Sequence, residues 1–365
     1  MKNPKRLISI ALIVIGVISA SWSLSRRLFA TPLPVEEGST GEALEAFAAI
    51  RPIDAHVHVF KNGPAFQAFL ERLHLTLLDI VVVDDTEEYD KKLEPQLKDP
   101  LAVVHSSHGH VVLCTTFDPF RFSDADFEAE TIKQLNQNFA EGAIAVKVWK
   151  NIGMELKTSE GKFVMPDDPK FEPIYRDIAK QGKTLLMHMA EPDLCWKPLD
   201  PADPLSEYYK QNPQWYMYNK PDRPSKATIL NARDHVLAEY PKLRVVGVHL
   251  GSMEMDLDEI ARHLDRYPNF AVDTAARMEY LMTAPHDKVR AFLIKYQARV
   301  LYGTDLDQEV IKEWEKTYAQ DWRFLATDQT IDFDGKKIRG LKLPQPVLRK
   351  IYRENAIHWI PGIVK

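Results

Sequence analysis

The sequence predicts one (β/α)₈ barrel, also called a TIM barrel, and three observations support this prediction. From Pro52 onward, short runs rich in β-branched residues alternate with longer amphipathic segments. Eight such runs occur, and each is followed by sequence with apolar residues at helical spacing. The first run and the eighth enclose about 255 residues, which is the usual size of this barrel. Continuous apolar strands separated by helices indicate a parallel sheet covered on both faces.

The expected strands fix where polar side chains can meet. They are 52–60, 77–85, 111–119, 143–150, 184–191, 244–251, 270–276 and 299–306. The helix before the fifth strand has clear ends, because Asp168 and Pro169 suit its first turn and Gly182 suits its end. Two long segments, 192–223 and 306–345, follow the fifth and eighth strands. In a barrel both would leave from the carboxyl-terminal face, where active sites are built.

The first thirty residues differ from the rest of the chain. Lys2, Lys5 and Arg6 precede an uncharged stretch, 7–25, and this order is typical of an export signal. The stretch is just long enough to span a bilayer as a helix, which favours an uncleaved signal anchor over a cleaved signal peptide. The basic residues should stay in the cytoplasm. We therefore expect an exported protein on the periplasmic side of the inner membrane, either anchored there or released after signal cleavage.

These features divide the chain into three parts. Residues 1–30 are the signal anchor or signal peptide, residues 31–50 are a linker, and residues 51–365 are the barrel domain. The formal net charge of −5 gives no reason to expect nucleic acid as a partner. The expected partners are a small-molecule substrate and, through the first segment, the membrane. The sequence is also compatible with a homo-oligomer.

The first strand carries a polar pattern with the period of a strand. Asp54, His56 and His58 are spaced two apart, so all three should face the lumen, while the alternating apolar residues, beginning with Ile53, should pack on the helices. Two imidazoles at this spacing can bind one metal ion. A His-x-His pair by itself is a weak signal, and the other strands supply the rest of the argument.

Three more polar residues stand at the ends of expected strands. His188, His249 and Asp305 end the fifth, sixth and eighth strands. The carboxyl-terminal rim is where this fold carries out chemistry, and buried ionisable groups need a common partner. A set of three histidines and one aspartate suits one divalent ion, with Zn²⁺ the best match and Fe²⁺, Mn²⁺ and Co²⁺ as alternatives.

A second His-x-His pair provides a control. His108 and His110, with His105 nearby, precede the third strand instead of ending one. They should therefore lie at the opposite, amino-terminal face of the barrel. We interpret them as exposed loop histidines and not as ligands.

The ordered motifs DAHVH, VKVWKN, LLMHMAEP, VVGVHLGS and LYGTD resemble those of the amidohydrolase-related family, within the amidohydrolase superfamily. The resemblance runs from about Pro52 to Ile360, which is essentially the whole domain. The family holds metal-dependent hydrolases and non-oxidative decarboxylases. The resemblance therefore implies an enzyme with a metal centre at the strand ends.

The resemblance also implies a role for each matching residue. His56 and His58 resemble the first two metal ligands, His188 the fifth-strand ligand and Asp305 the eighth-strand carboxylate ligand. His249 resembles the sixth-strand histidine that contacts substrate or activates water.

Further residues are candidates for the substrate pocket. Lys147 lies on the fourth strand with Trp149 on the same face. Some members of the superfamily carboxylate a lysine there to bridge two metals, whereas a plain cationic role toward substrate is the alternative. Arg277 follows the seventh strand and suits a substrate carboxylate or phosphate, or else an ion pair with an acid on the rim. Lys150 and Asp273 complete the candidate lining.

The expected reaction is hydrolysis of a small carbonyl-containing substrate (an amide, lactone or ester) through a metal-activated water. Asp305 would be the general base and return the proton to the leaving group, and His249 would orient the water or stabilise the oxyanion. Two alternatives remain. One is a non-oxidative decarboxylase with the same metal site, and the other is a membrane-tethered barrel that binds metal or ligand without catalysis. The intact ligand set argues against the second alternative.

Overall fold

The computed structural model describes residues 37–83, 93–201, 203, 205–307 and 311–364. The predicted signal anchor or signal peptide at residues 1–30 lies outside the described residues, so it stays a prediction. Among the described helices, none is both long enough and apolar enough to cross a bilayer.

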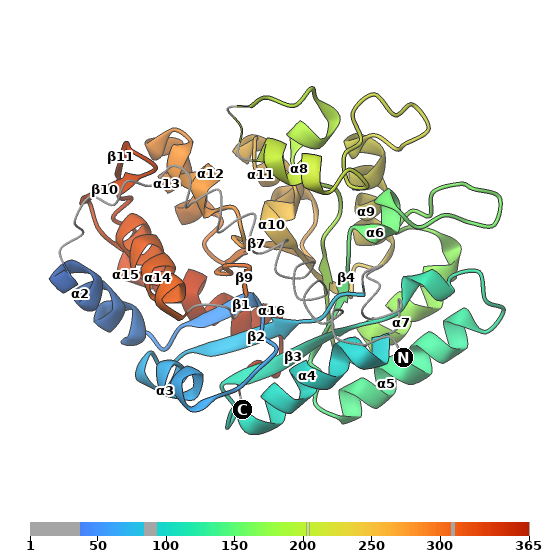
Figure 1. Cartoon of the computed structure of the whole chain (residues 1–365), viewed down its shortest axis with the longest axis horizontal. Coiled ribbons are helices and arrows are strands. Elements are labelled where there is room, and N and C mark those ends of the chain that lie inside the picture. Colours follow the sequence, from blue (N-terminus) through green and yellow to red (C-terminus); the bar gives the residue numbers. More distant parts are fainter. Residues whose placement is uncertain (1–36, 84–92, 202, 204, 308–310, 365) are drawn as a thin grey trace, which may run out of the picture.

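Each of the eight expected strand segments contains a strand, and the (β/α)₈ barrel is confirmed. The strands are β1 (Ile53–His58), β2 (Thr76–Ile80), β3 (Val111–Thr116), β4 (Ala145–Val148), β5 (Thr184–Met187), β6 (Arg244–Gly247), β7 (Phe270–Asp273), β8 (Val300–Leu301) and β9 (Leu306–Asp307). They pair in parallel in the order β8-β7-β6-β5-β4-β3-β2-β1-β9 (Figure 1).

The eighth expected strand closes the barrel in two pieces. Its first piece, β8, pairs with β7, and its second piece, β9, pairs with β1. Between them, the Ala55 amide donates to the Tyr302 carbonyl at 2.9 Å, and the Asp305 amide donates to the His56 carbonyl at 2.8 Å. The turn at 302–305 therefore links the last strand to the first, and it carries Asp305.

One main helix follows each strand segment and covers the outside of the sheet (Figure 1). These are α3 (Pro64–Arg72), α4 (Leu93–Ser106), α5 (Phe127–Ala140), α7 (Glu172–Lys180), α9 (Lys226–Glu239), α11 (Leu257–Arg266), α13 (His286–Lys295) and α14 (Ile311–Ala326). Shorter elements are α6 (Asn151–Met154), α8 (Leu205–Gln211), α10 (Val248–Gly251), α12 (Met278–Thr283), α15 (Gln345–Arg349), α16 (Asn355–Trp359) and the hairpin of β10 (Thr330–Phe333) and β11 (Lys336–Arg339). Asp168 begins its helix as expected, since its carboxylate accepts from the Lys170 amide.

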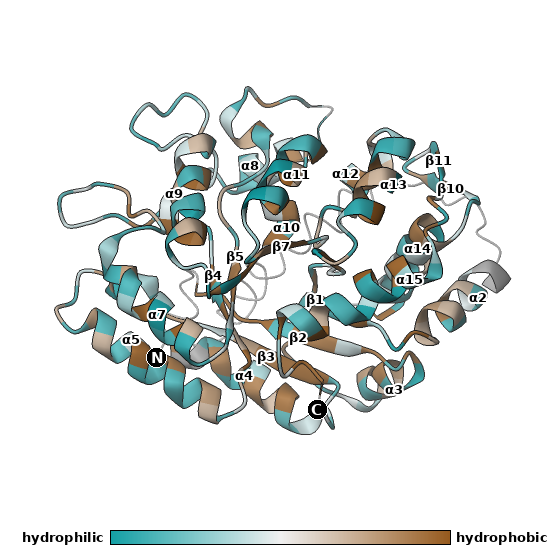
Figure 2. Cartoon of the chain, turned by 180° about the vertical axis from the view of Figure 1, so that it is seen from behind, coloured by the Kyte–Doolittle hydropathy of each residue, from teal (hydrophilic) through white to brown (hydrophobic). Residues whose placement is uncertain are grey.

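Apolar side chains fill both sides of the sheet. In Figure 2 the ribbon has the brown colour of hydrophobic residues along much of the sheet. A larger cluster lies between strands and helices, and a smaller one fills the barrel interior. Helix α16 belongs to the interior cluster through Ala356 and Trp359. Trp359 Nε1 donates to the Ala298 carbonyl, just before β8, at 3.0 Å. Because α16 covers the amino-terminal mouth, chemistry is left to the carboxyl-terminal end.

Strand β1 contains an irregularity that reverses its alternation. Its pairing with β2 shifts register between Asp54 and Val57. Ile53 belongs to the interior cluster, whereas Val57 belongs to the outer one, although the two are four residues apart. A bulge adds one residue to a strand and so exchanges its two faces. The prediction that Ile53 packs on the helices is therefore wrong.

The same bulge turns Asp54 away from the two histidines. The Asp54 carboxylate accepts from the Tyr318 hydroxyl of α14 at 2.9 Å, on the outside of the barrel. His56 and His58 come after the shift and face the lumen. The prediction that all three residues face the lumen is wrong for Asp54.

The expected linker at residues 31–50 also needs a correction. Its described part contains helix α2 (Glu37–Ala48), which packs along α14 (Figure 1). Ala43, Leu44 and Phe47 are buried there. From Glu37 the segment is thus part of the domain and not a tether.

Candidate metal centre

His56 is held in one orientation by a carboxylate from β7. Its Nδ1 lies 2.9 Å from Asp273 Oδ2, and both side chains are buried. A carboxylate can only accept, so Nδ1 carries a hydrogen, and in the neutral imidazole Nε2 then carries a lone pair. That Nε2 lies 3.1 Å from Asp305 Oδ1 and 3.3 Å from Lys147 Nζ.

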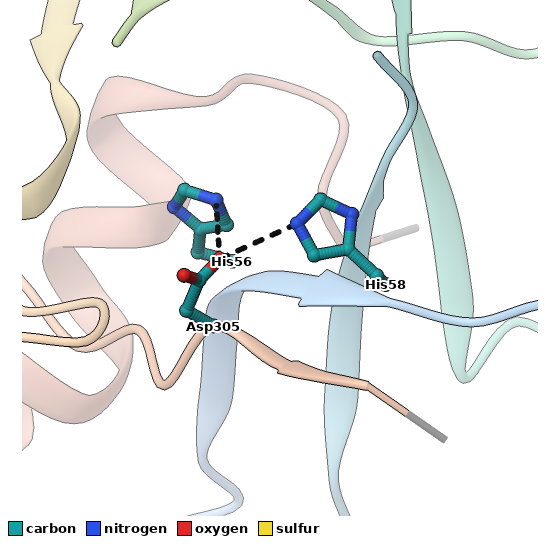
Figure 3. Close-up of side chains that lie close together, drawn as sticks. All are labelled: His56, His58 and Asp305. Atoms are coloured by element: carbon teal, nitrogen blue, oxygen red, sulfur yellow. Dashed lines mark ion pairs between the residues drawn. The ribbon is translucent and has the colours of Figure 1, made fainter. Parts of the chain in front are cut away.

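His58 is oriented in the same way by the backbone. Its Nδ1 lies 2.7 Å from the carbonyl oxygen of Ile80, the last residue of β2. Nδ1 is therefore the donor, and Nε2 is left as an acceptor. The Nε2 atom lies 3.3 Å from the same Asp305 oxygen, so both imidazoles point at one carboxylate (Figure 3).

Two imidazole acceptors and a carboxylate that face each other need a positive charge between them. The ligating atoms of His56, His58 and Asp305 all lie within 4.8 Å of one another. Nitrogen and oxygen donors in this combination suit a divalent transition metal, and the hydrogen bonds of the Nδ1 atoms are those that commonly orient metal-binding histidines. The residues therefore fit a metal ion.

Asp305 stands in the turn between β8 and β9 with a left-handed backbone, at φ 63°. Burial on its own would raise the pKa of its carboxyl, but the charge of the His56 imidazole and the hydrogen bond from it outweigh burial and hold the pKa well below its usual range. The carboxylate is ionised at any ordinary pH. It can act as a ligand and as a proton acceptor.

The same carboxylates act on His56. Burial and the Lys147 ammonium lower the pKa of His56, but Asp305 and Asp273 outweigh them and raise it above its ordinary value. The two carboxylates thus favour a positive charge at this imidazole. Either a proton on Nε2 or a divalent cation bound to Nε2 would supply that charge.

His188, the fourth predicted ligand, lies just outside the convergent group. It directly follows β5, and its Nε2 is buried with no hydrogen-bond partner among the described residues. Its ring centroid lies 4.3 Å from that of His249. The structure therefore brings three of the four predicted ligands together, and His188 lies next to this group, against the ring of His249.

The sequence predicts His249 at the end of the sixth strand. In the structure it follows the strand, because β6 stops at Gly247. It lies in a left-handed turn, α10, at φ 59°. The His249 amide donates to Asp273 Oδ1 at 2.7 Å, and its Nδ1 lies 2.9 Å from the Ala275 carbonyl. Its Nε2 is therefore an acceptor, and its ring lies 4.9 Å from that of His56.

Both outer histidines are neutral. Burial lowers the pKa of His188 well below its ordinary value, and the nearby His249 lowers it further. Burial likewise lowers the pKa of His249, and Arg277 adds to the effect although Asp305 opposes it. Neutral imidazole is the form that binds metal or accepts a hydrogen bond from water.

Lys147 points into the lumen, as the alternation of β4 predicts. It is 1% exposed, and burial lowers the pKa of its ammonium while Asp273 and Asp305 oppose that change. Lys147, Trp149 and Thr116 line a small hollow at the carboxyl ends of β3 and β4. Lys147 therefore lies at the candidate centre, whereas Trp149 lines the hollow beside it and packs its ring against Trp215, with centroids 5.2 Å apart.

Lys150, expected to line the pocket, is committed elsewhere. It forms a buried ion pair with Glu191 and donates to the Tyr208 hydroxyl at 2.9 Å. Its Nζ also lies 4.5 Å from the ring centroid of Trp215. These contacts anchor the long segment after β5, and the role of Lys150 in the pocket stays a prediction. Glu191, which follows His188 by three residues, was the signal that sequence reasoning missed.

Arg277 is buried at the rim and pairs with an acid. Its Nε lies 3.5 Å from Glu254 Oε2, and its Nη1 donates to the Ala276 carbonyl at 2.8 Å. Burial lowers the pKa of Arg277, but Glu254 outweighs it, so the guanidinium stays charged. The ion pair that we considered as one alternative is present, and Glu254, five residues after His249, is the acid.

Three comparisons bear on this geometry. The family model described as "Amidohydrolase" matches residues 53–361. A comparison with curated protein sequences found no match. Similar solved structures include a 2,6-dihydroxybenzoate decarboxylase from Rhizobium, with 13% identity over 85% of this chain and 98% of that chain at TM-score 0.54. An uncharacterized TIM-barrel protein from Bordetella bronchiseptica has 15% identity over 86% and 99% at TM-score 0.51.

A third similar structure contains a metal. It is a dihydroxybenzoic acid decarboxylase from Polaromonas with bound manganese and an inhibitor, with 11% identity over 85% of this chain and 96% of that chain at TM-score 0.51. At these identities the likeness concerns the fold.

Proposed function

Because the chain belongs to the amidohydrolase family, whose model it matches over residues 53–361, we propose that it is a metal-dependent hydrolase of small carbonyl-containing substrates. The substrate would be an amide, a lactone or an ester. One observation carries the proposal, namely that the acceptor nitrogens of His56 and His58 both face the ionised carboxylate of Asp305.

We propose that His56, His58, His188 and Asp305 hold one divalent ion. The buried Nε2 of His188 has no hydrogen-bond partner within the described part of the chain, which supports its place as the fourth ligand. Nitrogen and oxygen donors favour Zn²⁺, with Fe²⁺, Mn²⁺ and Co²⁺ as alternatives. When bound, such an ion supplies Lewis acidity, which lowers the pKa of water and polarises a carbonyl group.

Asp305 is the proposed general base. Its carboxylate stays ionised because its pKa is held well below the usual range, and it can take a proton from water and return it to the leaving group. His249 is neutral, with Nδ1–H committed to the Ala275 carbonyl, so its Nε2 can only accept. This tautomer suits an imidazole that orients water, and it argues against direct donation to an oxyanion.

The cationic groups near the centre suit an anionic substrate. Lys147 lies beside His56, and Arg277 is a buried cation at the rim whose charge is felt at His188 and His249. We propose that both bind an acidic group of the substrate, with Trp149 against its apolar part. A substrate carboxylate would then share Arg277 with Glu254.

A non-oxidative decarboxylase is the second candidate, and the same two cations favour it. Its substrate must carry a carboxylate, which Lys147 and Arg277 suit. Two of the similar solved structures are decarboxylases of dihydroxybenzoic acids. The metal ligands would be the same in both reactions.

Metal analysis and product analysis together test the proposal. The full chain should bind about one equivalent of a divalent transition metal. It should then hydrolyse members of a panel of esters, lactones and amides. Release of CO₂ from unsaturated or aromatic acids, without hydrolysis, would select the decarboxylase. Two equivalents of metal would indicate carboxylated Lys147. Failure to bind metal after reconstitution would overturn both candidates, and binding without turnover would favour the non-catalytic barrel.

We also propose export of this enzyme, because Lys2, Lys5 and Arg6 precede the apolar stretch 7–25. The full chain should fractionate with the membrane. Recovery of a shortened periplasmic form would replace the anchor with a cleaved signal, and full-length protein free in the cytoplasm would contradict export.

A further inference from the structure

Helix α2 lies outside the part of the chain that the family model matches. The helix ends at Ala48, and the match begins at residue 53. Nevertheless α2 packs along α14 on the outside of the barrel (Figure 1). Its contacts connect it to the segments that carry His56 and Asp305.

The contact between α2 and the barrel is centred on Phe47. Phe47 is 0% exposed. Its ring stacks on Tyr318 of α14, with centroids 4.9 Å apart and planes 20° apart. It also meets the edges of Tyr352 at 5.4 Å and of Tyr302 at 6.2 Å. Aromatic pairs in these geometries add to the burial of apolar surface, so Phe47 fixes the position of the Tyr318 ring.

Tyr318 in turn holds the side chain of Asp54 through a hydrogen bond. Its hydroxyl donates to Asp54 Oδ2 at 2.9 Å. The same oxygen accepts from the Thr304 hydroxyl at 2.6 Å, and Asp54 Oδ1 accepts from the amides of Thr304 and His56, each at 3.1 Å. One buried carboxylate therefore receives four hydrogen bonds from three segments of the chain.

Two of those segments carry candidate metal ligands. The amide of His56 belongs to the first ligand, and Thr304 immediately precedes Asp305. Asp54 therefore joins the bulge of β1 to the turn at 302–305, which also meet where the Asp305 amide donates to the His56 carbonyl. The distance between His56 Nε2 and Asp305 Oδ1 depends on how these two segments are held together.

We propose that α2 braces the metal centre, with Tyr318 and Asp54 as positioning residues between Phe47 and the ligands. The inference rests on the proposed metal site and adds to it a support from a helix that precedes the matched residues 53–361. Hydrogen-bond partners behind metal ligands commonly change metal affinity about 10–100-fold. The brace predicts an effect of this kind from Phe47, a residue that is not itself a candidate ligand.

Metal affinity in variants of the full chain tests the brace. Phe47→Leu keeps an apolar side chain but loses the stacked ring, and Tyr318→Phe keeps the ring but loses the hydroxyl. Each should weaken Zn²⁺ binding about 10-fold, measured by competition with a chelating dye. Phe292→Leu is the matched control, since Phe292 of α13 is a buried phenylalanine whose ring also contacts a tyrosine, Tyr296, with centroids 5.1 Å apart. Its Zn²⁺ affinity should match that of the unmodified chain.

The double variant shows whether Phe47 acts through Tyr318. If it does, Phe47→Leu should weaken Zn²⁺ binding little further once the Tyr318 hydroxyl is gone. Fully additive losses would overturn the proposal. So would equal affinities in Phe47→Leu and the Phe292→Leu control.

A second readout separates the brace from the proposed function. In metal-free protein, Phe47→Leu should accelerate hydrogen exchange at the amides of His56, Thr304 and Asp305, and Phe292→Leu should not. If the unmodified chain binds no Zn²⁺ but this selective acceleration occurs, the metal-centre proposal fails. The structural coupling between Phe47 and the segments of His56 and Asp305 would still be supported. Equal exchange at these three amides in both variants would overturn the coupling.

Discussion

The chain contains two His-x-His pairs at opposite ends of the barrel, and they differ in what faces them. His58 and His110 both direct Nδ1 at a backbone carbonyl, at 2.7 Å from Ile80 and 2.7 Å from Leu75. His58 then meets the carboxylate of Asp305, whereas His110 lies in the turn before β3 beside an exposed His108. Among the described residues, the groups of three ligating side chains include His56 and exclude both histidines of the second pair.

The comparison shows that the two pairs differ in their third partner, because only the first pair faces a carboxylate, that of Asp305. In a parallel barrel, the carboxyl ends of all strands meet, so a residue after β8 can face residues of β1. At the amino-terminal end, the corresponding space is filled by α16. Position along the strand, more than the motif itself, separates the two pairs.

Removal of one imidazole from each pair is the strongest way to break this comparison. His56→Ala should weaken metal binding more than about 100-fold, because a ligand matters more than the partners behind it. His110→Ala should leave both metal content and activity unchanged. Elemental analysis of the two variants after identical reconstitution checks this. Equal metal content in both would contradict the assignment of the centre.

Asp305→Asn separates binding from proton transfer. The amide oxygen can still act as a ligand, but it cannot accept the proton of water. Turnover should fall about 10²–10⁴-fold with part of the metal retained. Single-turnover measurements on metal-loaded variant check the rate. Near-normal turnover would instead make His249 the base.

Asp273→Asn tests the group that orients two histidines at once. Asp273 accepts from His56 Nδ1 and from the His249 amide with its two oxygens, and an asparagine has one acceptor oxygen. Metal affinity should fall about 10–100-fold in chelator competition. Asp265→Asn, at an exposed carboxylate that pairs with Lys295, is the control. A loss as large in the control would mean that Asp273 has no special role.

The sequence predicted the strand ends well, because alternation and strand-terminal polar residues have simple physical causes. His56, His58 and Asp305 meet as that reasoning expects. The face of Asp54 could not be predicted, because a single-residue bulge leaves no clear trace in the pattern. Once the face is exchanged, Asp54 becomes a support behind the centre.

Long-range pairing was the other limit of the sequence. The sequence predicts Lys150 as a pocket residue. Its ion-pair partner, Glu191, belongs to the next expected strand segment, and the spacing of residues along the sequence does not reveal that contact. Residues 37–48 belong to the segment that the sequence predicts as a linker. Their burial depends on the aromatic surface of α14, which becomes visible only in the folded chain.

The last prediction concerns the stability of the fold, and not metal binding, at the end of β2 that supports His58. Asp79, next to Ile80, is 1% exposed; its Oδ1 accepts from the Val59 amide at 2.9 Å, and its Oδ2 has no hydrogen-bond partner among the described residues. Burial raises the pKa of Asp79 to about 8, although the Val59 amide opposes it. In the unfolded chain the pKa should be about 3.9.

Between these two pKa values the folded chain binds one more proton than the unfolded chain at this residue. The free energy of unfolding should therefore fall as pH rises from about 4 to about 8, by at most about 1.4 kcal/mol per pH unit from Asp79. Asp79→Asn resembles the protonated form, so urea unfolding at pH 5 and pH 8 should show a flatter profile and higher stability at pH 8. A slope that remains below pH 6 would belong to Asp54, whose pKa burial raises to about 6. If the slope between pH 6 and pH 8 is the same in Asp79→Asn and in the unmodified chain, the prediction is wrong. Asp79 would then be ionised in the folded chain and would not make stability depend on pH in this range.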